Sequence, residues 1–289
     1  MNKVIITGGF GLLGSSLNKF LIDKGYKTFP LSRNDKISKF NGDVRNKDEF
    51  IKTINQIRPN FLINLIANTN VDDCERDVNF AYVSNVMTIM SIVEVIKTFK
   101  NIYLIHISTD QLYSGEGPHI ENKINPLNVY ALTKRLGEIE ACKVPSTILR
   151  VNFVGKSFSK NKKSFSDQMI NTLLKEEKIK VFDDVFFSPL HITSLCKVIE
   201  CVMLYKKTGV YNVGTIDGIT KADLVIKLAE LLKLNVSKIS QISVKNFNFV
   251  AKRPFDMRMK VNKFERIYNY NLPTIDNEID KLKFDYKDL

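Results

Sequence analysis

The chain has 289 residues and a formal net charge of +12, from 43 Lys and Arg against 31 Asp and Glu. Hydrophobic residues make up 44% of the sequence and charged residues 26%, an ordinary globular balance that excludes wholesale disorder and a collagen-like fibre. The basic excess is compatible with a phosphorylated small molecule or with a lysine-rich background, since no basic stripe typical of nucleic-acid binding stands out.

The first half of the chain alternates apolar, β-branched segments with amphipathic ones. We expect strands at residues 3–7, 26–31, 61–67, 102–108 and 147–151, and helices at 11–24, 86–96 and 130–142. Continuous apolar strands separated by amphipathic helices are typical of a parallel sheet covered on both faces. The pattern therefore predicts a doubly wound, Rossmann-like α/β domain over residues 1–155.

After residue 155 this alternation breaks. The lysine-rich segment 156–163 is expected to be a surface loop, followed by helices at 166–175, 192–205 and 221–232 and a strand at 209–214. We predict that about 189–214 returns to the Rossmann domain. Residues 156–188 and 215–289 then form a smaller, C-terminal α/β substrate-binding domain.

The cysteines and the apolar segments indicate the cellular compartment in which we expect the protein. Cys74, Cys142, Cys196 and Cys201 lack the spacing of a zinc site, and a chain of this length needs no disulfides. No apolar run approaches the ~20 residues of a membrane span, and the apolar start lacks a signal-peptide leader and cleavage site. We expect a cytoplasmic protein with no metal, no membrane contact and no nucleic-acid partner.

A glycine-rich turn, Thr7-Gly8-Gly9-Phe10-Gly11-Leu12-Leu13-Gly14, joins the first predicted strand to the first helix. The first glycine permits a tight turn, the second lets the backbone approach a pyrophosphate, and the third allows close packing of helix on sheet. The amide groups at the start of the helix favour an anion. The turn predicts a dinucleotide site that includes Gly8, Phe10, Gly11, Leu12, Leu13 and Gly14.

The second predicted strand ends in Leu31-Ser32-Arg33, where NAD sites usually carry an acidic residue. A guanidinium beside a hydroxyl can hold a 2′-phosphate through charge-assisted hydrogen bonds. Ser32 and Arg33 therefore predict NADPH as the cofactor, with NADH as the alternative.

Three further residues predict proton chemistry. Tyr130 and Lys134 are four residues apart on a predicted helix and share one face. A free tyrosine has a pKa near ~10, and a neighbouring ammonium would favour its phenolate. Thr109 ends the fourth strand, at the sheet edge where ligands bind in such folds. We predict Thr109, Tyr130 and Lys134 as the catalytic residues.

The spacing of the glycines resembles that of short-chain dehydrogenases/reductases, and the whole chain resembles their extended branch. Within that branch it is similar to the dTDP-4-dehydrorhamnose reductase family. Residues 108–115, Ser-Thr-Asp-Gln-Leu-Tyr-Ser-Gly, resemble the family's S-T-D-x-V-F-x-G, and residues 126–138 resemble its P-x-N-x-Y-x-x-x-K-x-x-G-E. Further likeness lies at 68–75, 85, 149–150, 188–189, 211–214 and 253–254.

This resemblance implies an NADPH-dependent reduction of the C4 ketone of a nucleotide-linked 4-keto-6-deoxy sugar, in deoxysugar or surface-polysaccharide biosynthesis, by a homodimer. Tyr130 would donate the proton, Lys134 would hold the cofactor ribose and lower the pKa of the tyrosine, and Thr109 would bond the carbonyl. The resemblance also implies cofactor contacts at Asp43, Val44, Leu65, Ile66 and Ala67. Substrate contacts are implied at Thr69, Val71, Asp110, Gln111, Asn152, Phe165 and Arg253, the last at the nucleotide diphosphate.

Two alternatives stay open: an epimerase that keeps NAD bound, and a non-catalytic, NADP-binding regulatory subunit. Gln111 stands where related dehydratases have a glutamate, and an amide cannot exchange a proton, which argues against dehydration. Residues 184–190 depart from the family's D-Q-x-G-S-P-T, because Val185, Phe187 and Leu190 are bulkier and more apolar. This departure predicts an altered pocket wall and leaves the identity of the sugar open.

Overall fold

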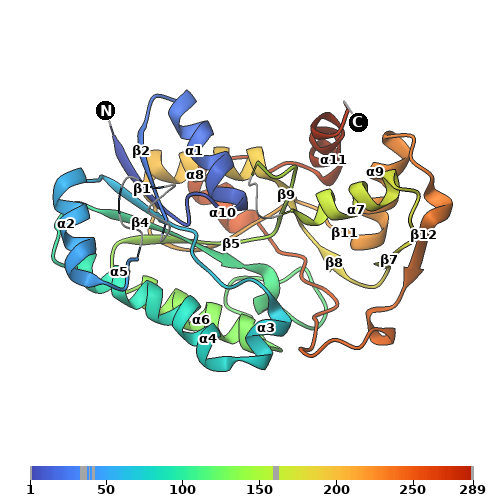
Figure 1. Ribbon diagram of the computed structural model, residues 1–289, viewed down its shortest axis with the longest axis horizontal. Helices are drawn as coiled ribbons and strands as arrows, with labels where there is room; N and C mark the ends of the chain where they lie inside the picture. Colours follow the sequence, from blue (N-terminus) through green and yellow to red (C-terminus); the bar gives the residue numbers. More distant parts are fainter. Residues whose placement is uncertain (1, 33–37, 39, 41–42, 159–162, 288–289) are drawn as a thin grey trace.

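The computed structural model describes residues 2–32, 38, 40, 43–158 and 163–287. Within these residues, a six-stranded sheet has the order β2-β1-β3-β4-β5-β10, and all its neighbouring strands are parallel (Figure 1). Its strands are β1 (Lys3–Thr7), β2 (Lys27–Leu31), β3 (Phe61–Asn64), β4 (Tyr103–Thr109), β5 (Ser146–Val151) and β10 (Gly209–Val213). The predicted parallel α/β fold is confirmed.

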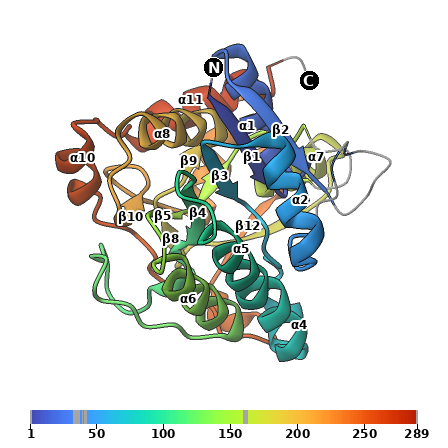
Figure 2. The ribbon, with the colours of Figure 1, turned by 90° about the vertical axis from the view of Figure 1, so that its left-hand side faces the viewer.

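Helices cover both faces of the sheet because both faces are apolar. Every residue of β3, β4 and β5 is buried, so their side chains pack against helices on either side. One face is covered by α1 (Leu12–Asp23), α8 (Ile192–Tyr205) and α10 (Asn262–Tyr268). The opposite face is covered by α2 (Lys47–Ile57), α5 (Thr88–Ile96) and α6 (Val129–Ala141), as the end-on view in Figure 2 shows.

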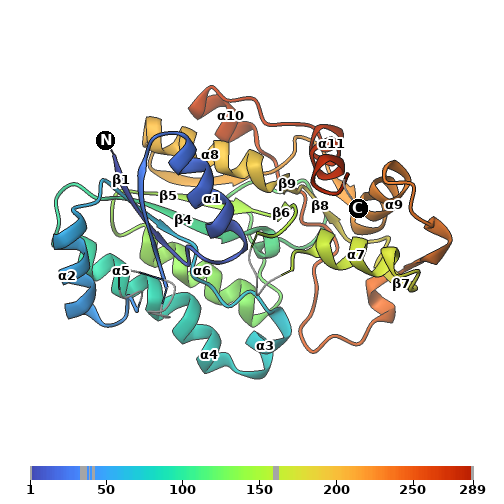
Figure 3. The ribbon, with the colours of Figure 1, turned by 45° about the horizontal axis from the view of Figure 1, so that its top comes forward.

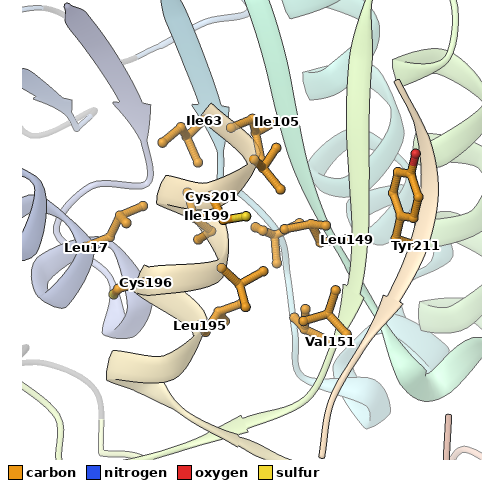
Figure 4. Close-up of a cluster of buried hydrophobic side chains, with 14 of the residues drawn as sticks. Leu17, Ile63, Ile105, Leu149, Val151, Leu195, Cys196, Ile199, Cys201 and Tyr211 are labelled. Atoms are coloured by element: carbon orange, nitrogen blue, oxygen red, sulfur yellow. The ribbon is translucent and has the colours of Figure 1, made fainter. Parts of the chain in front are cut away.

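The core on the α8 face is close-packed and apolar. Leu195 and Ile199 of α8 lie between Leu17 of α1 and the sheet residues Leu149 and Val151 (Figure 4). Burying side chains of this size contributes roughly 1.5–3 kcal/mol each. This packing fixes α1, and with it the glycine turn at its start, against the sheet.

The helical stretch Val78–Ile96 starts eight residues before the predicted helix at 86–96. It consists of α4 (Val78–Tyr82), a π-helical turn η1 (Val83–Met87) and α5. By length and composition alone it could cross a membrane, contrary to our expectation that no run approaches that length, but 56% of its apolar window is buried. All three of its parts pack against α6, as a core helix does.

The second part of the chain forms small sheets and further helices beyond the end of β5 (Figure 3). In the described chain, β7 (Ile179–Phe182) pairs with β12 (Ile239–Ile242), β8 (Phe186–Phe187) with β11 (Ile219–Thr220), and β6 (Phe153–Val154) with β9 (Leu190–His191). The helices here are α7 (Phe165–Leu174), α9 (Lys221–Leu231) and α11 (Ile275–Asp285), packed around an apolar core of their own. Short helical segments complete the chain: α3 (Val71–Arg76), η2 (Asp110–Leu112), η3 (Val236–Lys238) and η4 (Val244–Asn246).

Two local differences from the prediction have clear causes. β3 ends at Asn64 instead of residue 67, because the Asn64 side chain accepts hydrogen bonds from Thr7 Oγ1 (2.7 Å) and from the Ile66 amide (3.3 Å). The Leu65 amide still donates to the Thr7 carbonyl oxygen at 3.1 Å, and the chain turns away from β1 after that bond. α2 was not predicted, although Asn46 caps it and Asp48 and Glu49 lie in its first turn, which is favourable for a helix start.

Candidate active site

A cavity of about 390 Å³ opens where β1, β3, β4 and β5 end. In the strand order, β2 is added on one side of β1, and β3, β4, β5 and β10 are added on the other side. The strand order therefore reverses at β1, which is where open parallel sheets bind ligands. The predicted site residues that line the cavity are Gly8, Gly11, Leu12, Leu13, Gly14, Leu65, Ala67, Thr69, Val71, Thr109, Asp110, Gln111, Tyr130, Lys134 and Asn152.

The glycine turn forms one wall of the cavity. Gly8 has a φ of +70°, a backbone region that favours glycine. A Cβ atom on Gly14 would lie 2.4 Å from the Gly8 carbonyl oxygen, so α1 touches the turn backbone to backbone. No side chain caps α1 at Gly11, and its first turn carries no acidic residue. The first amides of α1, at Leu12 and Leu13, thus lie at the cavity with no acidic residue in their own turn, and they fit a pyrophosphate.

Lys134 lines the cavity and is held in place by the sheet. Its Nζ donates to the Ile107 carbonyl oxygen at 2.7 Å, and the side chain is 3% exposed. Burial lowers the pKa of Lys134 to about 8, with the charge of Glu138 opposing the decrease. The ammonium is therefore mostly charged at pH 7 and loses its proton as the pH rises through this value.

Tyr130 lies on the same face of α6, and its pKa moves opposite to our expectation. We expected Lys134 to lower it. In the structure, burial raises the pKa of Tyr130, hydrogen bonding with Thr109 lowers it in part, and the charges of Asp110 and Cys74 raise it further. Lys134 is not among the groups that shift the pKa of Tyr130, and its Nζ donates to the Ile107 carbonyl oxygen. Tyr130 is thus a neutral phenol at neutral pH, ready to donate a proton.

A buried ion pair fixes α6 against the sheet. Both oxygens of Glu138 accept hydrogen bonds from Arg150 of β5, at 2.8 and 2.7 Å, and Ser108 Oγ donates to Glu138 Oε1 at 2.6 Å. Such two-pronged bonds define a geometry as well as a charge pairing. Ser108 precedes Thr109, so the same contacts that orient α6 also orient the end of β4.

Asp110, Asn152 and Gln111 form a polar part of the cavity wall. Asn152 Nδ2 donates to Asp110 Oδ2 at 2.7 Å, and Thr109 Oγ1 lies 3.3 Å from Asp110 Oδ1. Burial raises the pKa of Asp110 to about 6, although the bond from Asn152 and the charge of Lys221 lower it in part. These polar groups suit a ligand that carries hydroxyl or carbonyl oxygens.

Several predicted cofactor residues do not line this cavity. Ile66 packs into the core beneath the sheet while its neighbours Leu65 and Ala67 face the cavity, as alternation along an extended chain requires. Val44 is buried, and its carbonyl accepts a 2.6 Å bond from Ser91 Oγ. The remaining ones are Phe10, Ser32 and Asp43, which lie outside the lining, and Arg33, which lies outside the described residues.

Two predicted substrate residues also lie outside the lining. Arg253 is engaged elsewhere: its Nη2 pairs with Asp72 at 3.0 Å, and its guanidinium lies 4.4 Å from the centre of the Phe249 ring. Phe165 packs into the core of the second part of the chain. The Lys221 ammonium lies 5.7 Å from the centre of the Phe165 ring.

Some cavity residues were missed in the sequence. Ile107, Ser108, Val151 and Phe153 belong to or follow the central strands, whose apolar runs gave no sign of which members face a ligand. Lys163 also lines the cavity and was hidden in a lysine-rich segment. Its position at the end of the predicted loop 156–163 was the available sequence signal.

Comparisons with known proteins show which family this chain resembles. The family model described as the RmlD substrate binding domain matches residues 1–286. The dTDP-4-dehydrorhamnose reductase of Aggregatibacter actinomycetemcomitans is 27% identical over 285 residues, which cover 93% of this chain and 94% of that protein. That of Escherichia coli K12 is also 27% identical, over 94% of this chain and 93% of that protein.

Solved structures agree in fold. The dTDP-4-dehydrorhamnose reductase of Bacillus anthracis, crystallised in complex with NADP, has a TM-score of 0.88 and 24% identity, and the match covers 98% of this chain and 99% of that one. A hypothetical dTDP-4-dehydrorhamnose reductase from Sulfolobus tokodaii has a TM-score of 0.83 and 28% identity, with 97% and 99% coverage. Because the family model spans nearly the whole sequence, the chain belongs to the RmlD substrate binding domain family, which confirms the resemblance to dTDP-4-dehydrorhamnose reductases.

Proposed function

We propose that this protein is an NADPH-dependent reductase of a nucleotide-linked 4-keto-6-deoxy sugar, of the dTDP-4-dehydrorhamnose type, in deoxysugar biosynthesis. One observation carries the proposal: Thr109, Tyr130 and Lys134 lie in the same cavity as the glycine turn. The curated relatives support it through their reductase activity, and the NADP complex of the Bacillus anthracis protein supports the choice of cofactor.

The cofactor's pyrophosphate would rest on the amides that follow Gly11, where the absence of a side-chain cap and the close Gly8–Gly14 contact leave room for it. Bound there, NADPH supplies the hydride. Tyr130 donates a proton to the ketone oxygen, since its raised pKa keeps the phenol protonated. Thr109 donates a hydrogen bond to the same oxygen, and Lys134, charged below a pKa of about 8, stabilises the developing negative charge.

The sugar would lie between Tyr130 and the polar wall of Asp110, Gln111 and Asn152, with Thr69 and Val71 at its side. In this proposal, residues 156–188 and 215–289 contribute the substrate-binding part of the molecule. A cytoplasmic location, where NADPH is available, and a homodimer belong to the same proposal.

The test is turnover by wild type and by Tyr130→Phe, followed as NADPH absorbance with dTDP-4-dehydrorhamnose. Removing the proton donor is expected to lower kcat by roughly 10²–10⁴-fold. NADPH affinity, measured by fluorescence, should change little. Tyr82→Phe, at a partly exposed position on α4, is the matched control and should keep wild-type turnover.

The same assay separates the alternatives. A reductase oxidises one NADPH per sugar converted, whereas an epimerase converts sugar without net loss of NADPH. Wild-type turnover retained in Tyr130→Phe would contradict the role of the tyrosine. No turnover and no nucleotide-sugar binding by the wild-type protein would contradict the proposed function itself.

A further inference from the structure

A second cavity, of about 30 Å³, lies beside the candidate active site. Gln111 lines both cavities, so the smaller one adjoins the wall on which the sugar would rest. Lys221, Arg253 and Met257 also line the smaller cavity. Its volume is about that of one water molecule or one hydroxyl group, which is too small for a phosphate or a sugar ring.

Gln111 presents a hydrogen-bond acceptor with no partner. Its Nε2 donates to Met257 Sδ at 3.1 Å, which fixes the orientation of the amide. Its Oε1 is fully buried and accepts no hydrogen bond from any described residue. A buried carbonyl oxygen left unsatisfied costs about 1–3 kcal/mol, so this atom is suited to a donor on a ligand.

Lys221 presents donors with no acceptor. It is the first residue of α9, and its backbone amide donates to the Val185 carbonyl at 3.0 Å. In the part of the chain that the structure describes, its ammonium makes no hydrogen bond and no ion pair, and its ring contact is with Phe165 at 5.7 Å. Burial lowers the pKa of Lys221, while the charge of Asp110 raises it and that of Arg253 lowers it.

Lys221 and Arg253, the two cationic side chains that line the smaller cavity, differ in their ion pairing. Arg253 is neutralised by Asp72 at 3.0 Å, and its Nη1 also lies 3.3 Å from the Ala251 carbonyl. Lys221 makes no ion pair with any residue that the structure describes, and the charge of Asp110 acts on it without a direct contact. Among the described residues that line this small space, the Lys221 ammonium and Gln111 Oε1 are polar groups that lack a hydrogen-bond partner.

We propose that Lys221 and Gln111 together bind one hydroxyl group of the substrate sugar and thereby select sugars that carry it. A hydroxyl oxygen accepts from the ammonium of Lys221 while its O–H donates to Gln111 Oε1. A phosphate oxygen cannot donate to Gln111, and a C–H group satisfies neither residue. This inference rests on the proposed function and adds a specificity-determining residue, Lys221, to it.

The experiment measures binding, so it does not depend on turnover. With NADP⁺ present, the affinities of wild type, Lys221→Met and Gln111→Met are determined by calorimetry for dTDP-rhamnose and its 2-deoxy and 3-deoxy analogues. For dTDP-rhamnose, Lys221→Met is expected to raise Kd about tenfold or more, because a hydrogen bond to a charged group is lost. Gln111→Met, which removes a neutral hydrogen bond, is expected to raise Kd about fivefold. For the one analogue that lacks the hydroxyl in question, wild type and both variants should bind alike.

Controls and outcomes separate this inference from the proposed function. Lys227→Met removes an exposed lysine of the same helix, paired with Asp276 at 3.3 Å, and should leave all affinities unchanged. Equal weakening by Lys221→Met for all three sugars and for dTDP would show that Lys221 binds the diphosphate, and would overturn the inference. Unchanged affinities would also overturn it, with the reductase proposal intact. Failure of wild type to bind any of these sugars would refute the proposed function, and the inference with it.

Discussion

Burial moves the pKa values of two oppositely charged cavity residues toward neutral pH. The pKa of Asp110 rises to about 6 and that of Lys134 falls to about 8, in both cases mainly through loss of contact with water. Between these values both groups are mostly charged, and the proposed chemistry uses the charge of Lys134. The folded protein therefore maintains two buried charges whose desolvation opposes stability, a cost common at active sites.

Replacing Asp110 by asparagine should stabilise the protein at neutral pH. A carboxyl whose pKa is raised on folding binds protons more readily in the folded state, so its cost is absent below the unfolded pKa of ~3.9 and complete above the folded value of about 6. We expect the free energy of unfolding of Asp110→Asn to exceed that of wild type by about 2–3 kcal/mol at pH 7.5. The excess should disappear as the pH falls toward 4.

Urea unfolding of both proteins at several pH values checks this expectation. Asp276→Asn is the control, because Asp276 is exposed and the change there should stay within about 0.5 kcal/mol. A difference between Asp110→Asn and wild type that does not vary with pH would contradict the assignment of a raised pKa to Asp110.

At the scale of elements, the contact between α1 and the glycine turn decides whether a cofactor fits. A methyl group at Gly14 would lie 2.4 Å from the Gly8 oxygen and 2.7 Å from the Gly9 carbonyl carbon, and backbone atoms cannot yield as a flexible side chain does. Gly14→Ala must therefore push α1 away from the turn. We expect a loss of roughly 1–3 kcal/mol of stability and at least tenfold weaker NADPH binding.

Fluorescence titration with NADPH and thermal unfolding measure the two effects. Lys19→Ala, at an exposed position on the same helix, is the control and should bind NADPH as wild type does. An unchanged NADPH affinity in Gly14→Ala would mean that the cofactor does not use this turn.

Elements with strong local signals were predictable from the sequence. The β4 and β5 strands were recognisable because every residue in them is buried, and α8 was predicted with its observed ends because its apolar spacing is continuous. The end of β3 was not predictable, because it depends on Asn64 bonding to Thr7, 57 residues away. The ion pair between Glu138 and Arg150 was likewise not predictable, although both residues lie in stretches that carry the family resemblance.

Site residues were likewise predictable where their signal is local in the sequence, and not where it depends on distant contacts. The glycine turn, Thr109 and the Tyr130–Lys134 pair carry their chemistry in short motifs, and one cavity brings them together. Lys221 carries no such signal, because it resembles a solvated lysine at the start of a helix. Only folding places it with Gln111 and Met257, which come from distant segments.

At the scale of the whole molecule, the segment 251–258 crosses from the second part of the chain to the Rossmann part. The Ala251 amide donates to Asp72 Oδ1 at 3.0 Å, Asn128 Nδ2 donates to the Lys252 carbonyl at 2.9 Å, and the Gly117 amide donates to Asp256 Oδ2 at 2.9 Å. Arg253 lies within this segment and pairs with Asp72 of α3. The family resemblance implies that Arg253 binds the substrate diphosphate; in that role its available charge would be set by this contact between the two parts of the molecule.

Asp72→Asn should tighten the binding of dTDP. The amide oxygen can still accept from the Ala251 amide, so the segment stays in place, while Arg253 loses the anion that competes with a diphosphate and the site loses a negative charge that repels it. A partly exposed ion pair of this kind is worth about 1 kcal/mol at most, which corresponds to an affinity gain of up to about fivefold.

Calorimetric titration with dTDP at low and high salt checks the expectation, and the gain should shrink as salt screens the charges. Asp73→Asn, one residue away and exposed, is the control and should leave the affinity near wild type. Weaker binding by Asp72→Asn would mean that Asp72 holds Arg253 in its binding position instead of competing with the diphosphate for it.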